Sequence, residues 1–197
     1  MIGDHSGKLK GRLALADHPG AAELDVNPLK TYDYLTLARQ RVFEWIRGLP
    51  AADYTREILA GQRPIAQIMT HIMISEGYYV LRMQGLSVPP YEEWPIKDES
   101  PPPFPVLEAS WTEQAARTRQ ALSAVREWGT DLEYEVTVDD GRPAIITASP
   151  GDIFTQLFQH EVHHRAQAMV LLRSLGVSVG DVDFNTLMYK RRDVAPS

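Results

Sequence analysis

The chain has 197 residues, of which 44% are hydrophobic and 23% are charged, the composition of one globular domain and not of a disordered or fibrous protein. It contains no cysteine, which excludes disulfides, thiolate metal sites, iron–sulfur clusters and a cysteine nucleophile. The formal net charge of -6 argues against nucleic acid as a partner, because that binding depends on a positively charged surface.

No segment approaches the roughly 20 consecutive apolar residues of a membrane span. Residues 1–13 also lack the apolar core of a secretion signal. We therefore expect a cytoplasmic protein with no membrane partner.

Residues 1–28 carry few large apolar side chains, and we expect a loosely ordered lead-in that ends at Asn27-Pro28. Apolar residues then recur at spacings of three and four, which predicts a first helix over residues 29–47. That helix should stop at Gly48-Leu49-Pro50. The pattern of residues 51–63 is ambiguous.

Pro64 is well placed to open a second helix, which should run to about Gln84 with Gly85 as its cap. Seven prolines in residues 86–105 cannot be helical and predict a long extended connection. A third helix is expected from about Pro105 to Trp128, with Gly129 ending it.

Alternating residues on either side of Asp140-Gly141 predict a β-hairpin within residues 132–148. Ser149 is a suitable N-cap for a fourth helix that runs to about Leu175 and ends at Gly176. The predicted fold is all-α: a four-helix bundle over residues 29–180, with a small hairpin before the last helix and a tail of residues 181–197.

The histidines are the most informative residues. Two of the six, His5 and His18, fall in the lead-in, whereas three crowd into residues 160–164. On a helical wheel His160 and His164 lie on the apolar stripe of the fourth helix, one turn apart. Two imidazoles at this spacing can bind one metal ion, although a histidine on an apolar stripe can also be a hydrogen-bonded core residue.

A metal held by the protein needs a third ligand. His71 is the other histidine on a predicted helix, and the wheel places it on the flank of that helix's apolar stripe. Glu76 lies in the middle of the same stripe. It could be a fourth ligand, an acceptor that orients an imidazole, or an ion-pair partner of Arg39 or Arg165.

The pattern H-x4-E at His71–Glu76, together with H-x3-H-R-x-Q at residues 160–167, resembles the DinB/YfiT-like superfamily of metal-binding four-helix bundles. The resemblance covers residues 29–176. It implies a divalent metal on His71, His160 and His164, with His163 not a ligand. Three neutral imidazoles leave coordination positions open and permit Zn, Ni, Fe, Mn or Co.

Relatives in this superfamily include transferases and isomerases that use a low-molecular-weight thiol such as bacillithiol or mycothiol. The resemblance thus implies a metalloenzyme that activates a thiol or a water toward a small electrophile: an S-transferase, an isomerase or a hydrolase. The alternative is a non-catalytic, stress-associated bundle with a structural metal that acts by binding or dimerisation. Many members are homodimers, and this chain could pair in the same way. The proline-rich segment and the long lead-in depart from the family's pattern, so the substrate cannot be copied from relatives.

Overall fold

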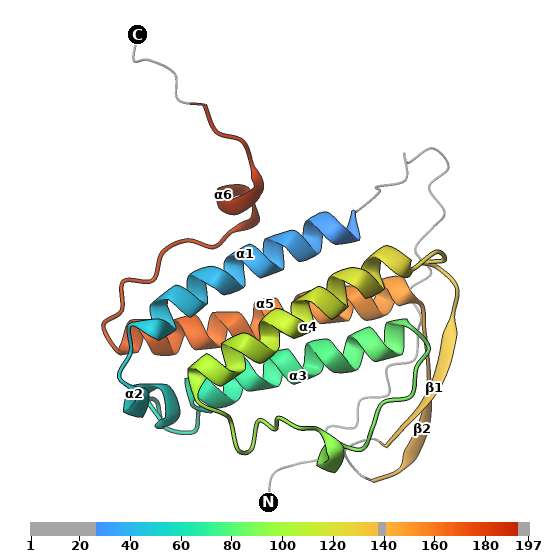
Figure 1. The fold of residues 1–197 in the computed structure, drawn as a ribbon, viewed down its shortest axis with the longest axis horizontal. Helices are drawn as coiled ribbons and strands as arrows, with labels where there is room; N and C mark the ends of the chain where they lie inside the picture. Colours follow the sequence, from blue (N-terminus) through green and yellow to red (C-terminus); the bar gives the residue numbers. More distant parts are fainter. Residues whose placement is uncertain (1–26, 138–140, 193–197) are drawn as a thin grey trace, which may run out of the picture.

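The computed structural model describes residues 27–137 and 141–192; the lead-in predicted before residue 27 lies outside this range. Four long helices form a bundle, and shorter elements connect them (Figure 1). In chain order the elements are α1 (Pro28–Arg47), α2 (Ala51–Thr55), α3 (Ile65–Met83), η1 (Tyr91–Glu93), α4 (Phe104–Ala124), β1 (Leu132–Thr137), β2 (Pro143–Ala148), α5 (Pro150–Ser174) and α6 (Phe184–Met188).

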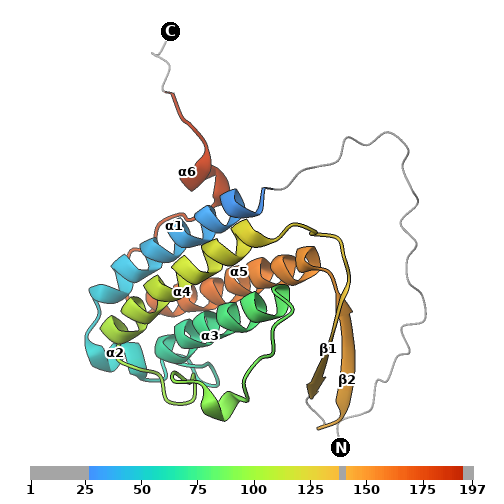
Figure 2. The same cartoon turned by 45° about the vertical axis from the view of Figure 1, so that its right-hand side comes forward.

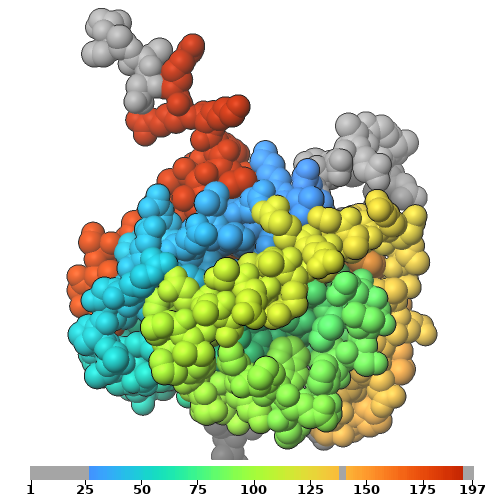
Figure 3. Space-filling model, in the orientation of Figure 1, coloured from blue at the N-terminus to red at the C-terminus, as the bar shows by residue number. Residues whose placement is uncertain are grey.

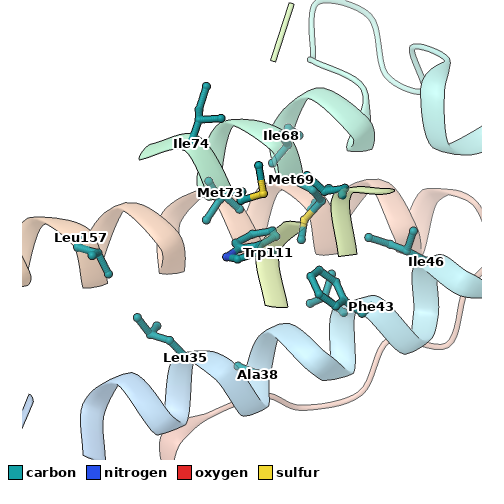
Figure 4. Close-up of a cluster of buried hydrophobic side chains, with 14 of the residues drawn as sticks. Leu35, Ala38, Phe43, Ile46, Ile68, Met69, Met73, Ile74, Trp111 and Leu157 are labelled. Carbon is teal, nitrogen blue, oxygen red and sulfur yellow. The ribbon is translucent and has the colours of Figure 1, made fainter. Parts of the chain in front are cut away.

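The four long helices surround one apolar core. Helix α3 packs most extensively on α5 and also on α4, while α1 packs on α4 and α5. Trp111 of α4 lies at the centre, only 1% exposed, with its ring 5.4 Å from that of Phe43 of α1. Met69 and Met73 of α3 and Leu157 of α5 surround the same core (Figure 4). The predicted four-helix bundle is confirmed.

Residues at the helix ends explain where the elements begin and stop. The Asn27 side chain accepts a hydrogen bond from the backbone N–H of Lys30 at the start of α1. Ser149 and Asp152 form a capping box at the start of α5. Gly176 has a φ of +80° directly after that helix, a conformation that favours glycine. These boundaries agree with those predicted from the sequence.

The end of α4 differs from the prediction. The helix stops at Ala124, not at Trp128, and Val125 is extended. The chain leaves the helix early so that Trp128 can reach the start of α5. There its carbonyl accepts from the N–H of Gly151 at 2.9 Å, and its ring packs 5.9 Å from that of Phe154. Tertiary packing has overridden local helix propensity here.

Strands β1 and β2 form an antiparallel hairpin in which Tyr134 pairs with Ile146. The hairpin stands beside the end of the bundle where α3 finishes and α5 begins (Figure 2). Gly141 has a φ of +81°, as a turn requires, whereas Asp140 lies outside the described residues. The predicted hairpin is therefore present between the third and fourth long helices.

The proline-rich connection after α3 is extended apart from the single turn of η1 and a tight turn closed by a bridge between Lys97 and Ser100, and it runs along α3 (Figures 1 and 3). Trp94 packs against α3 at Gly77, where an added Cβ would lie 3.3 Å from the indole ring. The glycine thus lets the connection approach the helix closely. This contact places the connection over the central turns of α3.

Two short helices lie in segments for which the sequence indicated no element. Helix α2 occupies the ambiguous stretch before α3. Helix α6 lies in the predicted tail and packs on α1, with the ring of Phe184 5.1 Å from that of Tyr34. Among the residues that the structure describes, no helix is long and apolar enough to cross a membrane.

Candidate metal centre

The three predicted ligands meet between two neighbouring helices. His71 comes from the middle of α3, and His160 and His164 come from successive turns of α5. The Nε2 atoms of His71 and His160 are 3.1 Å apart, and one ring nitrogen from each of the three histidines lies within 4.8 Å of the others. Two nitrogens on a tetrahedral ion, each about 2.1 Å from it, are separated by about 3.4 Å. The spacing and chemistry of the three nitrogens therefore fit a single divalent cation.

The environment keeps the two clustered imidazoles of α5 unprotonated near neutral pH. Burial, together with the nearby His164 and His71, lowers the pKa of His160 to about 4. Burial also lowers the pKa of His164, although the hydrogen bond to Gln167 opposes that effect. Only a neutral imidazole has a lone pair to donate to a metal. Near neutral pH both histidines of α5 are thus ready to act as ligands.

An aspartate from the proline-rich connection orients His71. The Nδ1 of His71 is 3.0 Å from Oδ2 of Asp98, and the Tyr91 hydroxyl donates to Oδ1 of Asp98 at 2.5 Å. Burial raises the pKa of Asp98, but the hydrogen bond from Tyr91 and the proximity of His71 outweigh it, so the net shift is downward. The charged carboxylate accepts a hydrogen bond from the Nδ1–H of His71, which leaves the lone pair of this ring on Nε2, the atom that faces His160.

Gln167 orients His164 in a similar way. Its side-chain oxygen lies 2.8 Å from Nδ1 of His164, and an amide oxygen can only accept a hydrogen bond. The proton of His164 is therefore on Nδ1, and its Nε2 is free. The amide nitrogen of Gln167 lies 3.1 Å from Nε2 of His163. His163 is exposed and is not one of the three clustered histidines.

Glu76 does not join the histidine cluster; it belongs to a buried charge network next to it. Its carboxylate accepts from Arg39 at 2.8 Å, and Arg39 also pairs with Glu161 of α5 at 2.6 Å. Of the roles left open by the sequence, the structure supports the ion pair with Arg39. The remaining donors to Glu76 are uncharged: Tyr32, Trp111 and Thr118.

Arg165 completes this network. Its Nη1 lies 3.4 Å from Glu161, and its Nη2 donates to the Tyr34 hydroxyl at 2.7 Å. The network joins α1, α3, α4 and α5 through charges that are almost wholly buried. It fixes the position of α3 relative to α5, which is the relation that brings His71 to His160 and His164.

A cavity of about 430 Å³ opens beside His71. Its wall comes from one stripe of α3, from the proline-rich connection and from the end of β1. Most of its lining is apolar or aromatic, as is typical of sites for small molecules. The lining residues on which the chemistry depends are His71, Ser75, Tyr78, Arg82, Trp94 and Asp98.

Comparison with known proteins places the chain in a family. The sequence model of the DinB family matches residues 23–193. The chain belongs to the DinB family. Among solved structures, the crystal structure of a DinB-like protein from Bacillus cereus aligns with a TM-score of 0.57 and 20% identity, over 78% of this chain and 94% of that one. This likeness supports the DinB fold. No curated protein matches the chain.

Sequence reasoning missed two residues of this DinB site that matter to its chemistry. Asp98 lies in an irregular connection whose path no periodicity reveals, so its contact with His71 could not be foreseen. The contact of Gln167 with His164 was likewise not predicted from the sequence. The H-R-x-Q pattern held that signal, because it places Gln167 three residues after His164, and residues three apart on a helix face each other.

Proposed function

We propose that this DinB-family chain is a metal-dependent enzyme in which His71, His160 and His164 bind one divalent cation. The observation that supports this proposal is the convergence of three imidazole nitrogens, two of them from rings with lowered pKa, beside an open cavity. A structural zinc site is normally closed by four protein ligands, whereas three ligands leave a position for a reacting molecule. Zn, Ni, Fe, Mn and Co all accept imidazole ligands.

When bound, the cation would lower the pKa of a thiol or a water and polarise an electrophile. The chain's own residues prepare this chemistry. Asp98 and Gln167 hold His71 and His164 in the tautomers that direct Nε2 toward the centre. The aromatic walls at Tyr78 and Trp94 would exclude water from part of a bound substrate.

Within this site we favour a thiol-dependent transfer. The sulfur of a small thiol such as bacillithiol or mycothiol would form a bond to an electrophilic carbon. The leaving group would depart with the electron pair of its bond, and the thiol proton would pass to solvent. The cavity supports this reaction because it offers room for a small electrophile directly beside His71.

Metal content tests the first half of the proposal. The chain should be purified without a histidine tag, loaded with Zn²⁺, and assayed by elemental analysis beside His164→Ala and His163→Ala. His163 is the matched control, because it neighbours His164 on the same helix but lies outside the cluster. We expect one metal per chain in the wild type and in His163→Ala, and a large loss in His164→Ala. Full retention of metal in His164→Ala would contradict the assignment.

Turnover tests the second half. Metal-loaded and chelated protein should be compared with bacillithiol and with mycothiol on chlorodinitrobenzene, in which sulfur replaces chloride and hydrogen chloride is released. We expect turnover that requires metal and is lost in His164→Ala. If several electrophiles give no turnover while chelation sharply lowers the melting temperature, the metal is structural and the protein acts by binding or dimerisation.

A further inference from the structure

We propose that Arg82 makes the cavity beside the histidines a site for an elongated ligand with an apolar body and a carboxylate end. This inference deepens the proposed function, since it names the substrate class of the same site. Its starting point is one face of α3. His71, Ser75, Tyr78 and Arg82 are spaced by four, three and four residues and all line the cavity.

This spacing sets the two ends of the cavity well apart. His71 and Arg82 are separated by about 16 Å along the helix axis, because each residue of an α-helix adds about 1.5 Å. Between them the cavity is lined by Ile74, Tyr78 and Trp94, which offer apolar and aromatic surface. An extended molecule could therefore place one end at the histidines and the other at Arg82.

The charges at the two ends are opposite. Asp98 places a carboxylate beside His71, with its Oδ2 3.0 Å from Nδ1 of that ring. Arg82 places a guanidinium at the far end of the lining stripe of α3. In the metal-free chain, a carboxylate on a ligand would be repelled by Asp98 and attracted by Arg82, which would orient the ligand in one sense. A cation bound at the histidines would offset the charge of Asp98, so the preference for Arg82 has to be measured with and without metal.

Arg82 is held in position but is not neutralised. Its guanidinium carbon lies 5.1 Å from the ring centre of Tyr78 and 4.5 Å from that of Tyr134 on β1. Over residues 27–137 and 141–192, no carboxylate forms an ion pair with it. Aromatic rings attract a cation without cancelling its charge. The charge of Arg82 thus remains available to an anion in the cavity.

The hydrogen-bond donors of Arg82 are also largely unused. A guanidinium has five N–H groups. Among the residues that the structure describes, this side chain makes one hydrogen bond, from Nη2 to the carbonyl of Glu135 at a long 3.4 Å, and its Nε is buried without a partner. A carboxylate is the group that best matches the planar array of donors on arginine. These observations favour a carboxylate over an uncharged polar group.

The test compares phenylbutanoate with phenylbutanamide, which has a similar shape but no charge, by calorimetry on the Zn²⁺-loaded full chain. We expect the acid to bind at least about tenfold more tightly, the factor that one charge-assisted hydrogen bond supplies. Arg82→Met should abolish the preference. Arg173→Met, which removes an exposed arginine near the end of α5, should retain it. If neither compound binds, or both bind equally, the proposal is wrong.

Two further arms separate Arg82 from the metal and from loss of folding. Removal of metal with EDTA should leave the preference for the acid intact; a preference that requires metal and survives in Arg82→Met would place the carboxylate on the cation and overturn the proposal. If Arg82→Met proves unfolded by circular dichroism, Arg82→Lys replaces it. That variant keeps the charge but loses the paired donors, so the preference should shrink, and an unchanged preference would count against Arg82. Metal content measured on the same samples shows separately whether the proposed metal site has failed.

Discussion

Replacing Arg39 with methionine tests whether the buried charge network holds the bundle together. Arg39 is 3% exposed and pairs with Glu76 and Glu161, each 2% exposed. Methionine keeps most of the length of the arginine stem but lacks the guanidinium, whose carbon lies 4.2 Å from the ring centre of Trp111. The substitution leaves two buried carboxylates without their shared cation. Within residues 27–137 and 141–192, Glu76 then retains only uncharged donors, and Glu161 retains only the 3.4 Å contact with Arg165.

Removing one partner of a buried ion pair typically costs about 3–5 kcal/mol. For a chain of this size, 1 kcal/mol corresponds to about 2–4 °C, so the melting temperature of Arg39→Met should fall by roughly 6–20 °C. Urea unfolding followed by circular dichroism measures the free energy of unfolding directly. The matched control is Arg41→Met on the same helix, whose pair with Glu44 is exposed and should contribute less than about 1 kcal/mol.

The double variant Arg39→Met with Glu161→Gln sharpens the test, because it removes one of the stranded charges. We expect the double variant to lose less free energy of unfolding than the sum of the losses in Arg39→Met and Glu161→Gln. The reason is that residues in direct contact couple by about 0.5–3 kcal/mol. If Arg39→Met unfolds within about 1 kcal/mol of Arg41→Met, the network does not stabilise the bundle and the reasoning fails.

Three other outcomes follow from the histidine site. Asp98→Asn should weaken Zn²⁺ binding about 10–100-fold, because loss of a carboxylate that orients a ligating histidine has this effect in other metal sites. Equilibrium competition with a chelator measures the affinity, and an unchanged affinity would show that Asp98 does not support His71. Zn²⁺ at about 100 times its Kd should stabilise the wild type by about 2.7 kcal/mol, or about 5–11 °C, in a thermal melt, and the absence of any shift would argue against a site that exists only in the folded state. In metal-free protein the pKa of His160 is lowered from 6.5 to about 4, so across this window the unfolded chain binds a proton that the folded chain does not. Stability should therefore fall as pH falls from about 6.5 to about 4, and melts of His160→Gln should show a shallower decline; an equally steep one would assign the effect to other groups.

Local sequence patterns predicted most of the bundle, because each long helix carries its own apolar periodicity and its own end signals. Ser149 and Asp152 at the start of α5 are an example. The pattern failed where distant parts of the chain decide the structure. Helix α4 ends at Ala124 because Trp128 packs against the start of α5, a contact that the local sequence does not reveal.

The residues of the candidate site also fall into two groups, those that local sequence predicts and those that depend on distant parts of the chain. The i, i+4 spacing was enough to place His160 and His164 together, since both lie on one helix. His71 lies on another helix, on the flank of its apolar stripe. Its prediction as the third ligand therefore required the family resemblance. Asp98 and Arg82 could not be predicted, because their roles depend on how an irregular connection and a hairpin lie against α3.

Helix α5 presents two sets of residues that alternate along its central turns. His160 and His164 point toward the histidine cluster, while the next residues in sequence, Glu161 and Arg165, point into the charge network. Successive residues of an α-helix differ by about 100° in direction. The rotational setting of α5 is consequently specified twice, and an insertion or deletion of one residue upstream within the helix would misalign both sets at once. Evolution can vary the length of the surrounding connections, but this stretch of the helix must keep its phase.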